Sequence, residues 1–529
     1  MALLEIQDLK LTLGDQPILR GLSLTLEAGQ VLGVVGESGS GKSITALSIL
    51  GLPPRGARVE GAIRFEGRDL VGLSDAELSR LRGDRIGIVF QEPMTALNPV
   101  MTIGAQVAEV ARLHRKVSRA EANAAARETL DRVGLADIPL TRYPHELSGG
   151  QRQRAAIAIA VVLSPRLLIA DEPTTALDVT TQAEILKLLL HLVREDGAAL
   201  ILISHDLALV AEAADHVAVM KDGEIVEQGE TGAVFKALTH PYTRALAADA
   251  ERLPVRTRTP DAGAAPILEA RGVVRDYPGP RDFLRAGPPV RALRGVSLEI
   301  RPGEIVGLVG ESGSGKSTLL RALLALDPVQ GGEVRLAGEP FTPASPRRRR
   351  RAIQLVFQDP NGSLDPRWTV ERLVAEPLHL LDARLSPTER RARVEAVLAK
   401  VGLPAEAADR YPHQFSGGQR QRIAIARALI VEPDVIALDE AVSALDVTVR
   451  AEVLDLLAKL SDDLGVAYLF VTHDLGVARG LTDRLLVMRE GEIVEAGPTA
   501  ELFAAPKHPY TAQLIAATPN LARALAARS

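Results

Sequence analysis

The sequence predicts an α/β protein made of two tandem domains, each with a largely parallel sheet and a phosphate-binding loop. Three observations support this prediction. The octapeptide GESGSGKS occurs at residues 36–43 and again at residues 310–317, and the same later motifs follow each copy in the same order. Each copy lies between a short apolar strand pattern and a helical pattern. Strands also alternate with helices along each half, which is typical of a parallel α/β sheet.

The glycine-rich loop is the first element of each half. Its strand pattern covers residues 31–35 and 305–309, and its helical pattern covers residues 44–50 and 318–326. Glycines let backbone N–H groups face a phosphate, and the next helix presents its positive N-terminal end to the same anion. A lone glycine pattern can be a plain turn, but this strand–loop–helix setting favours a nucleotide site. The expected nucleotide-binding residues are Gly36, Glu37, Ser38, Gly39, Ser40, Gly41, Lys42 and Ser43, with Gly310, Glu311, Ser312, Gly313, Ser314, Gly315, Lys316 and Ser317.

Three further strands of each half end in polar residues. A short apolar strand at residues 86–90 or 353–357 precedes a glutamine, a later one ends in an Asp-Glu pair, and a third ends in a histidine. Because successive side chains of a strand point to opposite faces, the two carboxylates of a pair can take different roles. We expect the aspartate to bind Mg²⁺ and the glutamate to orient or deprotonate the attacking water.

Phosphoryl transfer needs mainly positioning and countercharge, so these strand ends should converge on the loop. The loop lysine would reach the β- and γ-phosphates, and the loop serine would hold Mg²⁺. We expect the glutamine to sense Mg²⁺ and the water, and the histidine to hydrogen-bond the γ-phosphate. The expected catalytic residues are Gln91, Glu172, His205, Gln358, Glu440 and His473. The expected Mg²⁺ ligands are Ser43, Gln91, Asp171, Ser317, Gln358 and Asp439.

A charged, Ala-rich segment at residues 102–143 and 369–411 predicts a helical insertion in each half. The pentapeptides LSGGQ (residues 147–151) and FSGGQ (residues 415–419) follow it, and each opens another helix. We call them the signature segments. Serine and glycine amides at a helix N-terminus make a second anion site, which has nothing in its own half to bind. Its expected residues are Ser148, Gly149, Gly150 and Gln151, with Ser416, Gly417, Gly418 and Gln419.

Together with the other motifs, the signature segments resemble the ATP-binding cassette (ABC) family over nearly the whole chain. The resemblance implies that each half has a phosphate-loop core, an antiparallel β subdomain and a helical subdomain. It also implies head-to-tail composite sites, in which the signature segment of one half closes over ATP held by the other. Asp178 and Asp446 match the family's D-loop. Tyr277 matches its adenine-stacking aromatic residue, but Leu13 stands at that place in the first half, so the equivalence of the two sites stays open.

A finer resemblance comes from FQEPMTALNP, FQDPNGSLDP and the tetrapeptide HPYT, which begins at His240 and at His508. These are similar to ATPases of the oligopeptide, dipeptide and nickel importers, fused as in the YejF-like and glutathione-importer classes. The resemblance implies ATP-driven import with two membrane permeases and an extracytoplasmic binding protein, at the cytoplasmic face of the inner membrane. The cargo stays open among oligopeptide, dipeptide, glutathione and nickel. Taken alone, HPYT predicts a capped turn before a helix.

The expected domains are residues 1–250 and residues 267–529, joined by a linker at residues 251–266. The first domain resembles the D-type ATPase of these importers, and the second resembles their F-type partner ATPase. Pro254, Pro260 and Pro266 interrupt any helix in the linker, so few contacts are expected to cross this boundary. An arginine run at residues 347–351 is expected to be a solvated loop, with acidic lipid headgroups or a partner as the alternative. A Pro/Gly-rich loop near residues 278–289 has no counterpart in the first half.

Composition limits the remaining function classes. The 529-residue chain has 46% hydrophobic residues and a formal net charge of −5, which argues for a soluble globular protein and against a broad nucleic-acid footprint. It has no cysteine, which excludes disulfides, thiolate zinc sites and Cys-ligated iron–sulfur clusters. No apolar run approaches the ~20 residues of a spanning helix. The alternative function is a tandem ATPase acting on ribosomes, whose halves would be joined by a long charged helical linker.

Overall fold

A computed structural model describes residues 2–175, 177–261, 263–279, 281–282, 285–286, 288–382, 385–443 and 445–528. They form two compact units. The first unit comprises Met1–Leu177, Thr181–Glu251 and Pro519–Ser529. The second comprises Asp178–Thr180 and Arg252–Thr518.

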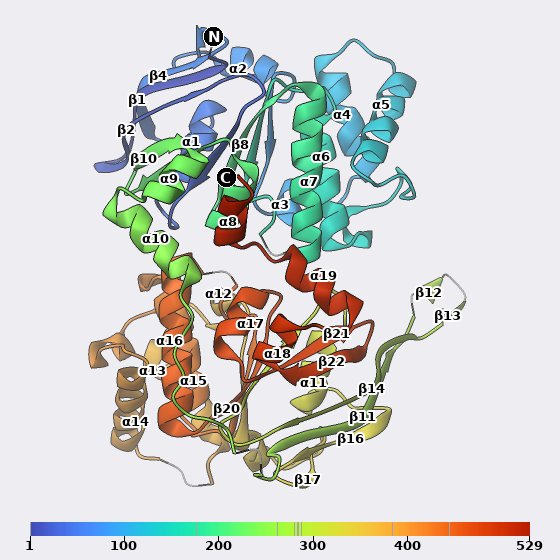
Figure 1. Ribbon diagram of the computed structural model, residues 1–529, viewed down its shortest axis with the longest axis vertical. Coiled ribbons are helices and arrows are strands. Elements are labelled where there is room, and N and C mark those ends of the chain that lie inside the picture. Colours follow the sequence, from blue (N-terminus) through green and yellow to red (C-terminus); the bar gives the residue numbers. More distant parts are fainter. Residues whose placement is uncertain are drawn as a thin grey trace. The chain divides into compact units, whose positions relative to one another are not determined.

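The first unit contains a six-stranded sheet in the order β10-β9-β3-β8-β7-β6 and a four-stranded sheet in the order β2-β1-β4-β5 (Figure 1). In the six-stranded sheet all neighbours are parallel except β9 and β10. The four-stranded sheet is antiparallel. The strands are β1 (Leu4–Leu13), β2 (Gln16–Leu26), β3 (Val31–Val35), β4 (Ala57–Phe65), β5 (Arg68–Asp69), β6 (Ile86–Val89), β7 (Leu167–Asp171), β8 (Ala199–Ser204), β9 (His216–Lys221) and β10 (Glu224–Glu230).

Helices of the first unit connect these strands and form the predicted insertion. The insertion consists of α4 (Ile103–His114) and α5 (Arg119–Arg132), which pack on each other and on α6 (Gly149–Val161). The other helices are α1 (Lys42–Ile49), α2 (Asp75–Leu81), α3 (Pro93–Ala96), η1 (Pro144–Glu146), α7 (Val179–Asp196), α8 (Leu207–Ala213), α9 (Thr231–Ala237), α10 (Pro241–Glu251) and the C-terminal α20 (Leu521–Ala526), which packs on α8.

The second unit repeats this architecture. Its sheets have the orders β18-β19-β20-β15-β21-β22 and β14-β11-β16-β17, with a small hairpin of β12 and β13. The first is parallel except for β21 and β22, and the second is antiparallel. The strands are β11 (Leu268–Tyr277), β12 (Arg281–Asp282), β13 (Arg285–Ala286), β14 (Val290–Ile300), β15 (Ile305–Val309), β16 (Gly331–Leu336), β17 (Glu339–Pro340), β18 (Ile353–Val356), β19 (Val435–Asp439), β20 (Ala467–Val471), β21 (Arg484–Arg489) and β22 (Glu492–Pro498).

Helices of the second unit match those of the first, with more 3-10 turns. The insertion again comes between β18 and α15. The helices are α11 (Lys316–Leu323), η2 (Arg347–Ala352), α12 (Pro360–Ser363), α13 (Val370–Ala375), η3 (Glu376–Leu380), α14 (Pro387–Lys400), η4 (Ala405–Asp409), η5 (Pro412–Gln414), α15 (Gly417–Leu429), α16 (Val447–Leu464), α17 (Leu475–Leu481), α18 (Thr499–Ala504) and α19 (Pro509–Ala517).

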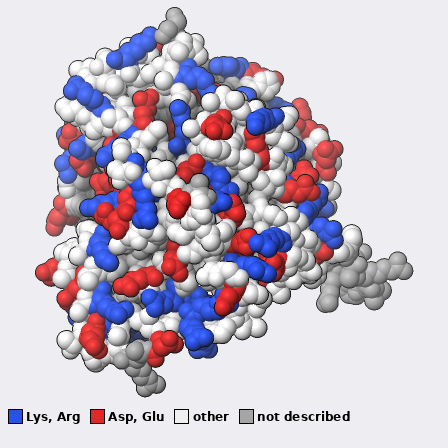
Figure 2. Space-filling model, turned by 60° about the horizontal axis from the view of Figure 1, so that its bottom comes forward, with Lys and Arg blue, Asp and Glu red and all other residues white. Residues whose placement is uncertain are grey.

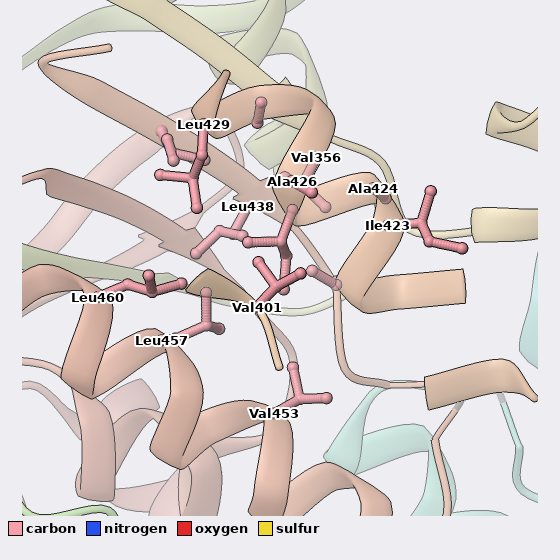
Figure 3. Close-up of a cluster of buried hydrophobic side chains, with 14 of the residues drawn as sticks. Val356, Val401, Ile423, Ala424, Ala426, Leu429, Leu438, Val453, Leu457 and Leu460 are labelled. Atoms are coloured by element: carbon pink, nitrogen blue, oxygen red, sulfur yellow. The ribbon is translucent and has the colours of Figure 1, made fainter. Parts of the chain in front are cut away.

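The physical basis of the elements is visible in their sequences. The central strands β3, β7, β8 and β20 are buried at every position, which fits strands covered on both faces. In the second unit, side chains of α15, α16 and the strands β18 and β19 interdigitate in one apolar cluster (Figure 3). Helices α5 and α14 each begin with a capping box, in which a serine and a glutamate satisfy the first free amides. The predicted α/β class with two cassette domains is therefore confirmed.

The surface is mixed in charge. On the face shown in Figure 2, lysine and arginine side chains are interspersed with aspartate and glutamate, and neither sign covers a broad area. Within the ranges given above, no helix combines the length and the apolar character needed to cross a membrane.

Candidate nucleotide-binding site

The phosphate loop of the first unit joins β3 to α1. Gly41 caps the helix in the left-handed conformation with φ 101°. The Lys42 ammonium is buried and donates to the carbonyl oxygens of Gly36 and Glu37, both at 2.8 Å. The loop therefore curls around its own lysine, the group expected to meet the phosphates.

The second unit reproduces this loop between β15 and α11. Lys316 donates to the carbonyl oxygens of Gly310 at 2.7 Å and Glu311 at 2.8 Å. Burial lowers the pKa of Lys316, although nearby carboxylates, Glu440 first among them, oppose this shift. The lysine thus lies in an environment where an additional anion would stabilise its charged form.

The first residue of each loop must be glycine for steric reasons. A Cβ on Gly36 would lie 2.2 Å from the carbonyl oxygen of Met220, and a Cβ on Gly310 would lie 2.2 Å from that of Met488. Their φ angles are 153° and 155°. A side chain there would force the loop away from the neighbouring strand.

The two carboxylates of the first Asp-Glu pair make different contacts. Asp171, the last residue of β7, accepts a hydrogen bond from the Ser43 hydroxyl at 3.1 Å. Burial raises the pKa of Asp171, and the hydrogen bond from Ser43 partly offsets it. Burial likewise raises the pKa of Asp439 in the second unit. Both aspartates would be stabilised in their charged form by a cation.

Glu172 turns away from the strand direction because its backbone is left-handed, with φ 45°. Its carboxylate accepts hydrogen bonds from the Gln91 amide at 2.8 Å and the Thr175 hydroxyl at 3.0 Å. His205 Nδ1 lies 3.3 Å from the same carboxylate. Burial opposes ionisation of Glu172, but the interactions with His205, Thr175 and Lys42 together outweigh it and lower the pKa of Glu172.

The corresponding residues of the second unit have the same geometry. Glu440 has φ 46° and accepts from the Gln358 amide at 2.8 Å. His473 Nδ1 lies 3.2 Å from the Glu440 carboxylate. Burial would lower the pKa of His473, but the hydrogen bond with Glu440 and the charges of Glu440 and Asp474 together outweigh it and raise that pKa. The pKa of Glu440 is lowered in turn.

The histidines are placed by a strand followed at once by a helix. His205 comes after β8, and Asp206 caps α8 by accepting from the amides of Ala208 and Leu209. Asp474 caps α17 in the second unit in the same way, after His473. The cap fixes where the strand ends, so each histidine faces the glutamate of the neighbouring strand.

The signature segments form helix N-termini rather than parts of this cluster. Ser148 caps α6 and shares a capping box with Gln151, and Ser416 and Gln419 do the same for α15. Gly149 and Gly417 are the first residues of the two helices. In the portions of each unit that the structure describes, no hydrogen bond joins a signature segment to the phosphate loop of the same unit. Their expected ATP-binding role stays a prediction.

The expected adenine-stacking position differs between the units. The Tyr277 hydroxyl donates to Asp327 at 3.2 Å, and the Arg275 guanidinium lies 4.7 Å from the centre of its ring. Leu13, at the corresponding place in the first unit, is 41% exposed. The Pro/Gly-rich loop that follows Tyr277 lies partly outside the described residues.

Sequence reasoning missed two kinds of site residue. Thr175 supports the Glu172 carboxylate, and nothing in its sequence position predicts that contact. The tyrosines of the two HPYT segments reach the phosphate loops. Their recurrence at the same separation as the two strand-end histidines was the available signal.

Comparison with known families decides the relationship. The chain matches the family described as ABC transporter over residues 19–175 and 293–443. The chain belongs to the ABC transporter family. The resemblance that the motifs predicted is thereby confirmed, and with it an ATPase fold in each half. This ABC protein also matches the family described as Oligopeptide/dipeptide transporter, C-terminal region, over residues 226–272 and 494–528.

Several relatives of this ABC protein carry one name. It is 46% identical to "Glutathione import ATP-binding protein GsiA" of Escherichia coli O157:H7, over 94% of this chain and 86% of that protein. The proteins of that name in Escherichia coli (strain K12) and Shigella sonnei (strain Ss046) have the same identity and coverage. Among solved structures, the ATP-binding cassette MJ0796 bound to ADP and Pi is 33% identical, covering 44% of this chain and 98% of that chain, with a TM-score of 0.40.

Proposed function

We propose that this ABC protein is the ATP-hydrolysing, energy-coupling subunit of an importer for peptides of the oligopeptide, dipeptide or glutathione class. The observation that carries the proposal is the 46% identity, over 94% of the chain, to proteins named for glutathione import. Two matches to the C-terminal region of oligopeptide and dipeptide transporters support it. They favour transport over the ribosome-associated alternative.

Each phosphate loop would hold the triphosphate of ATP, with Mg²⁺ beside it. The Ser43 hydroxyl and the Asp171 carboxylate lie 3.1 Å apart, and both are hard oxygen donors of the kind that Mg²⁺ accepts. Gln91 donates a hydrogen bond to Glu172, the residue after Asp171. Among described residues no group of three or more acidic or histidine side chains could hold a metal alone, which suits an ion that takes further ligands from phosphate and water. Ser317, Gln358 and Asp439 would act in the second unit, and the ion would neutralise charge developing on the phosphates.

Glu172 and Glu440 would orient the attacking water. Their lowered pKa values keep the carboxylates ionised, so each can accept a hydrogen bond from water. His205 and His473 touch these carboxylates and would donate to the γ-phosphate. The glutamine, glutamate and histidine of each unit therefore form one cluster that can hold both the water and the phosphate.

The signature segments would complete each site from the other half, as the family resemblance implies. Such closure can drive transport only if ATP binds the closed state more tightly than the open one. Moving an equilibrium from mostly open to mostly closed needs about 5.5 kcal/mol of differential binding. Two permease subunits would receive the motion at the cytoplasmic face of the membrane, and an extracytoplasmic binding protein would select the cargo.

The test of the ATPase assignment is the double variant Glu172→Gln and Glu440→Gln. Each substitution keeps the size of the side chain but removes the carboxylate that would orient water. We expect ATP turnover to fall at least a hundredfold while ATP still binds, measured by phosphate release and by nucleotide retention on the purified protein. Turnover equal to that of the unaltered protein would contradict the assignment.

The transport assignment has a separate test. Cells with and without the protein are compared for uptake of labelled dipeptide, oligopeptide, glutathione and Ni²⁺. Selective loss of one peptide cargo is expected, together with co-purification of membrane permeases. Co-purification of ribosomal proteins with unchanged uptake would instead support the alternative function.

A further inference from the structure

The HPYT segments have no part in the proposed chemistry, yet both are held in one defined conformation. His240 and His508 each precede a helix, and their Nδ1 atoms accept from the amides of Tyr242 at 3.2 Å and Tyr510 at 3.1 Å. The predicted capped turn is therefore present in both units. It also fixes the tyrosine two residues later.

A glutamate from the neighbouring hairpin anchors each turn from the other side. Glu227 accepts from the amides of Thr239 at 3.0 Å and His240 at 3.1 Å. Glu495 accepts from the amides of Lys507 at 2.8 Å and His508 at 3.0 Å. Burial would raise the pKa of both glutamates, but the Thr243 and Thr511 hydroxyls together with these amides outweigh it and lower the pKa, so both accept as carboxylates near neutral pH.

The tyrosine side chains end on the phosphate loops. The Tyr242 oxygen accepts from the backbone N–H of Glu37 at 3.1 Å. The Tyr510 oxygen accepts from the backbone N–H of Glu311 at 2.9 Å. The first contact lies within the first unit and the second within the second unit, so the structure contains two independent instances of it.

Each tyrosine holds the peptide group that also binds the loop lysine. The carbonyl of Gly36 and the N–H of Glu37 belong to one peptide plane, with Lys42 on its oxygen and Tyr242 on its nitrogen. In the second unit the same plane receives Lys316 on the oxygen and Tyr510 on the nitrogen. A peptide plane bonded at both ends cannot rotate without breaking one of the two bonds.

The rings themselves are fixed. Tyr242 is 8% exposed and Tyr510 is 3% exposed. The ammonium of Lys221 lies 4.8 Å from the centre of the Tyr242 ring, and the Arg489 guanidinium lies 4.9 Å from that of Tyr510. Burial raises the pKa of Tyr510 to about 12, so the phenol keeps its proton at neutral pH.

We propose that Tyr242 and Tyr510 are positioning residues of the two phosphate loops, each holding the first peptide plane of its loop while the lysine binds the nucleotide. The inference rests on the proposed nucleotide-binding role of these loops. A lysine ammonium has three N–H donors, so a phosphate competes for them with the Gly36 or Gly310 carbonyl, and the tyrosine holds that plane from its other end. The HPYT segment thus links the C-terminal hairpin of each unit to phosphate binding.

The test is the variant Tyr242→Phe, Tyr510→Phe in the full chain. It removes two hydroxyl groups and keeps both rings. The matched control is Tyr468→Phe, because the buried Tyr468 hydroxyl has no hydrogen-bond partner among described residues. The measurements are kcat and KM for ATP, and the binding of ATP and of adenosine, which lacks phosphates.

We expect KM and Kd for ATP to rise about threefold to tenfold, as expected for loss of a neutral hydrogen bond, with kcat within about twofold. Adenosine binding and the control variant should be unchanged. An unchanged Kd for ATP, or an equal loss of adenosine binding, would overturn the positioning role. Absence of ATP hydrolysis by the unaltered protein would instead contradict the proposed function, and the binding measurements would still decide the role of the tyrosines.

Discussion

At the scale of single residues, the arrangement around Glu172 and Glu440 depends on one backbone angle. Strand alternation predicts opposite directions for the two carboxylates of each pair. The aspartate ends its strand in both units, but the glutamate leaves it in a left-handed conformation and meets a glutamine and a histidine. The division of contacts was predictable from the Asp-Glu sequence, whereas the turn that produces it was not.

The first glycine of the loop offers a sharp test at this scale. Gly310→Ala would place a methyl group 2.2 Å from a backbone oxygen of β21, whereas Gly313→Ala, in the same loop, would meet nothing within 4 Å. We expect Gly310→Ala to weaken ATP binding by more than tenfold and to lower the unfolding temperature. Gly313→Ala, whose φ is also positive at 84°, should show only the smaller backbone strain.

Both variants are compared by nucleotide titration and by thermal unfolding. Equal effects of the two substitutions would show that the close approach to β21 is unimportant.

The loop tyrosines show why part of the site was beyond sequence analysis. Tyr242 is separated from Glu37 by 205 positions. The repeat separation marks the tyrosines as equivalent positions, but no spacing rule states which loop they contact. The phosphate loops and strand ends could be predicted because parallel strands bring their carboxyl ends to one edge of a sheet.

At the scale of elements, the arginine run contacts solvent, as expected, but it is not a loop. It forms the 3-10 helix η2, none of whose residues is buried, and three of its arginines donate to backbone carbonyls. Arg349 donates to Leu336 and Pro340, both at 2.8 Å. Arg350 and Arg351 donate in the same way to other carbonyls. The run therefore supplies hydrogen-bond donors to carbonyl groups at the ends of several strands and helices of the second unit. Charge patterning alone could not indicate this role.

This leads to a prediction about stability. Arg349→Ala would remove the guanidinium donor from the carbonyl oxygens of Leu336 and Pro340, so the free energy of unfolding of the second unit should fall by ~1–3 kcal/mol. Arg347→Ala is the control, because this exposed residue makes no hydrogen bond among described residues, and its effect should lie within about 0.5 kcal/mol. Urea unfolding measures both. A larger effect at Arg347 would contradict the hydrogen-bonding role of Arg349.

At the scale of the whole molecule, the first part of the linker packs on the second unit. Residues 252–258 lie on the second unit, where Pro254 is buried. The Arg256 guanidinium forms ion pairs with Asp462 and Asp483. Asp462 also accepts from the Thr257 amide at 2.7 Å. Composition signalled a break in the helix but not the surface on which the chain then lies.

The docked linker can be tested by a designed disulfide. A Cβ on Gly480 of α17 would lie 3.3 Å from Cβ of Leu253, close to the separation of two bonded cysteines. Because the chain has no cysteine, the variant Leu253→Cys, Gly480→Cys has only these two thiols. We expect mild oxidation to join them nearly completely, as detected by mass spectrometry of tryptic peptides under non-reducing conditions.

The control pair is Leu253→Cys with Gly476→Cys, on the same helix. It should form little disulfide, because the linker does not contact Gly476 among described residues. Similar oxidation of both pairs would mean that the linker moves freely over α17.

The duplicated architecture was readable from the repeated motifs, since each motif marks the same element in both halves. Which segments of the chain belong to each unit could not be predicted in the same way. The C-terminal segment Pro519–Ser529 belongs to the first unit, where α20 packs on α8. Such docking depends on the shape of a folded surface, and short helices carry no sequence signal for it.

The left-handed backbone at Glu172 and Glu440 has a consequence for how this protein can change over time. A residue other than glycine in this conformation costs on the order of 1–3 kcal/mol, whereas a whole domain is stable by only ~5–15 kcal/mol. Selection for heat resistance alone would favour glycine at both positions. Under the proposed mechanism, a chain that keeps the two carboxylates gives up thermostability in exchange for turnover, once in each half.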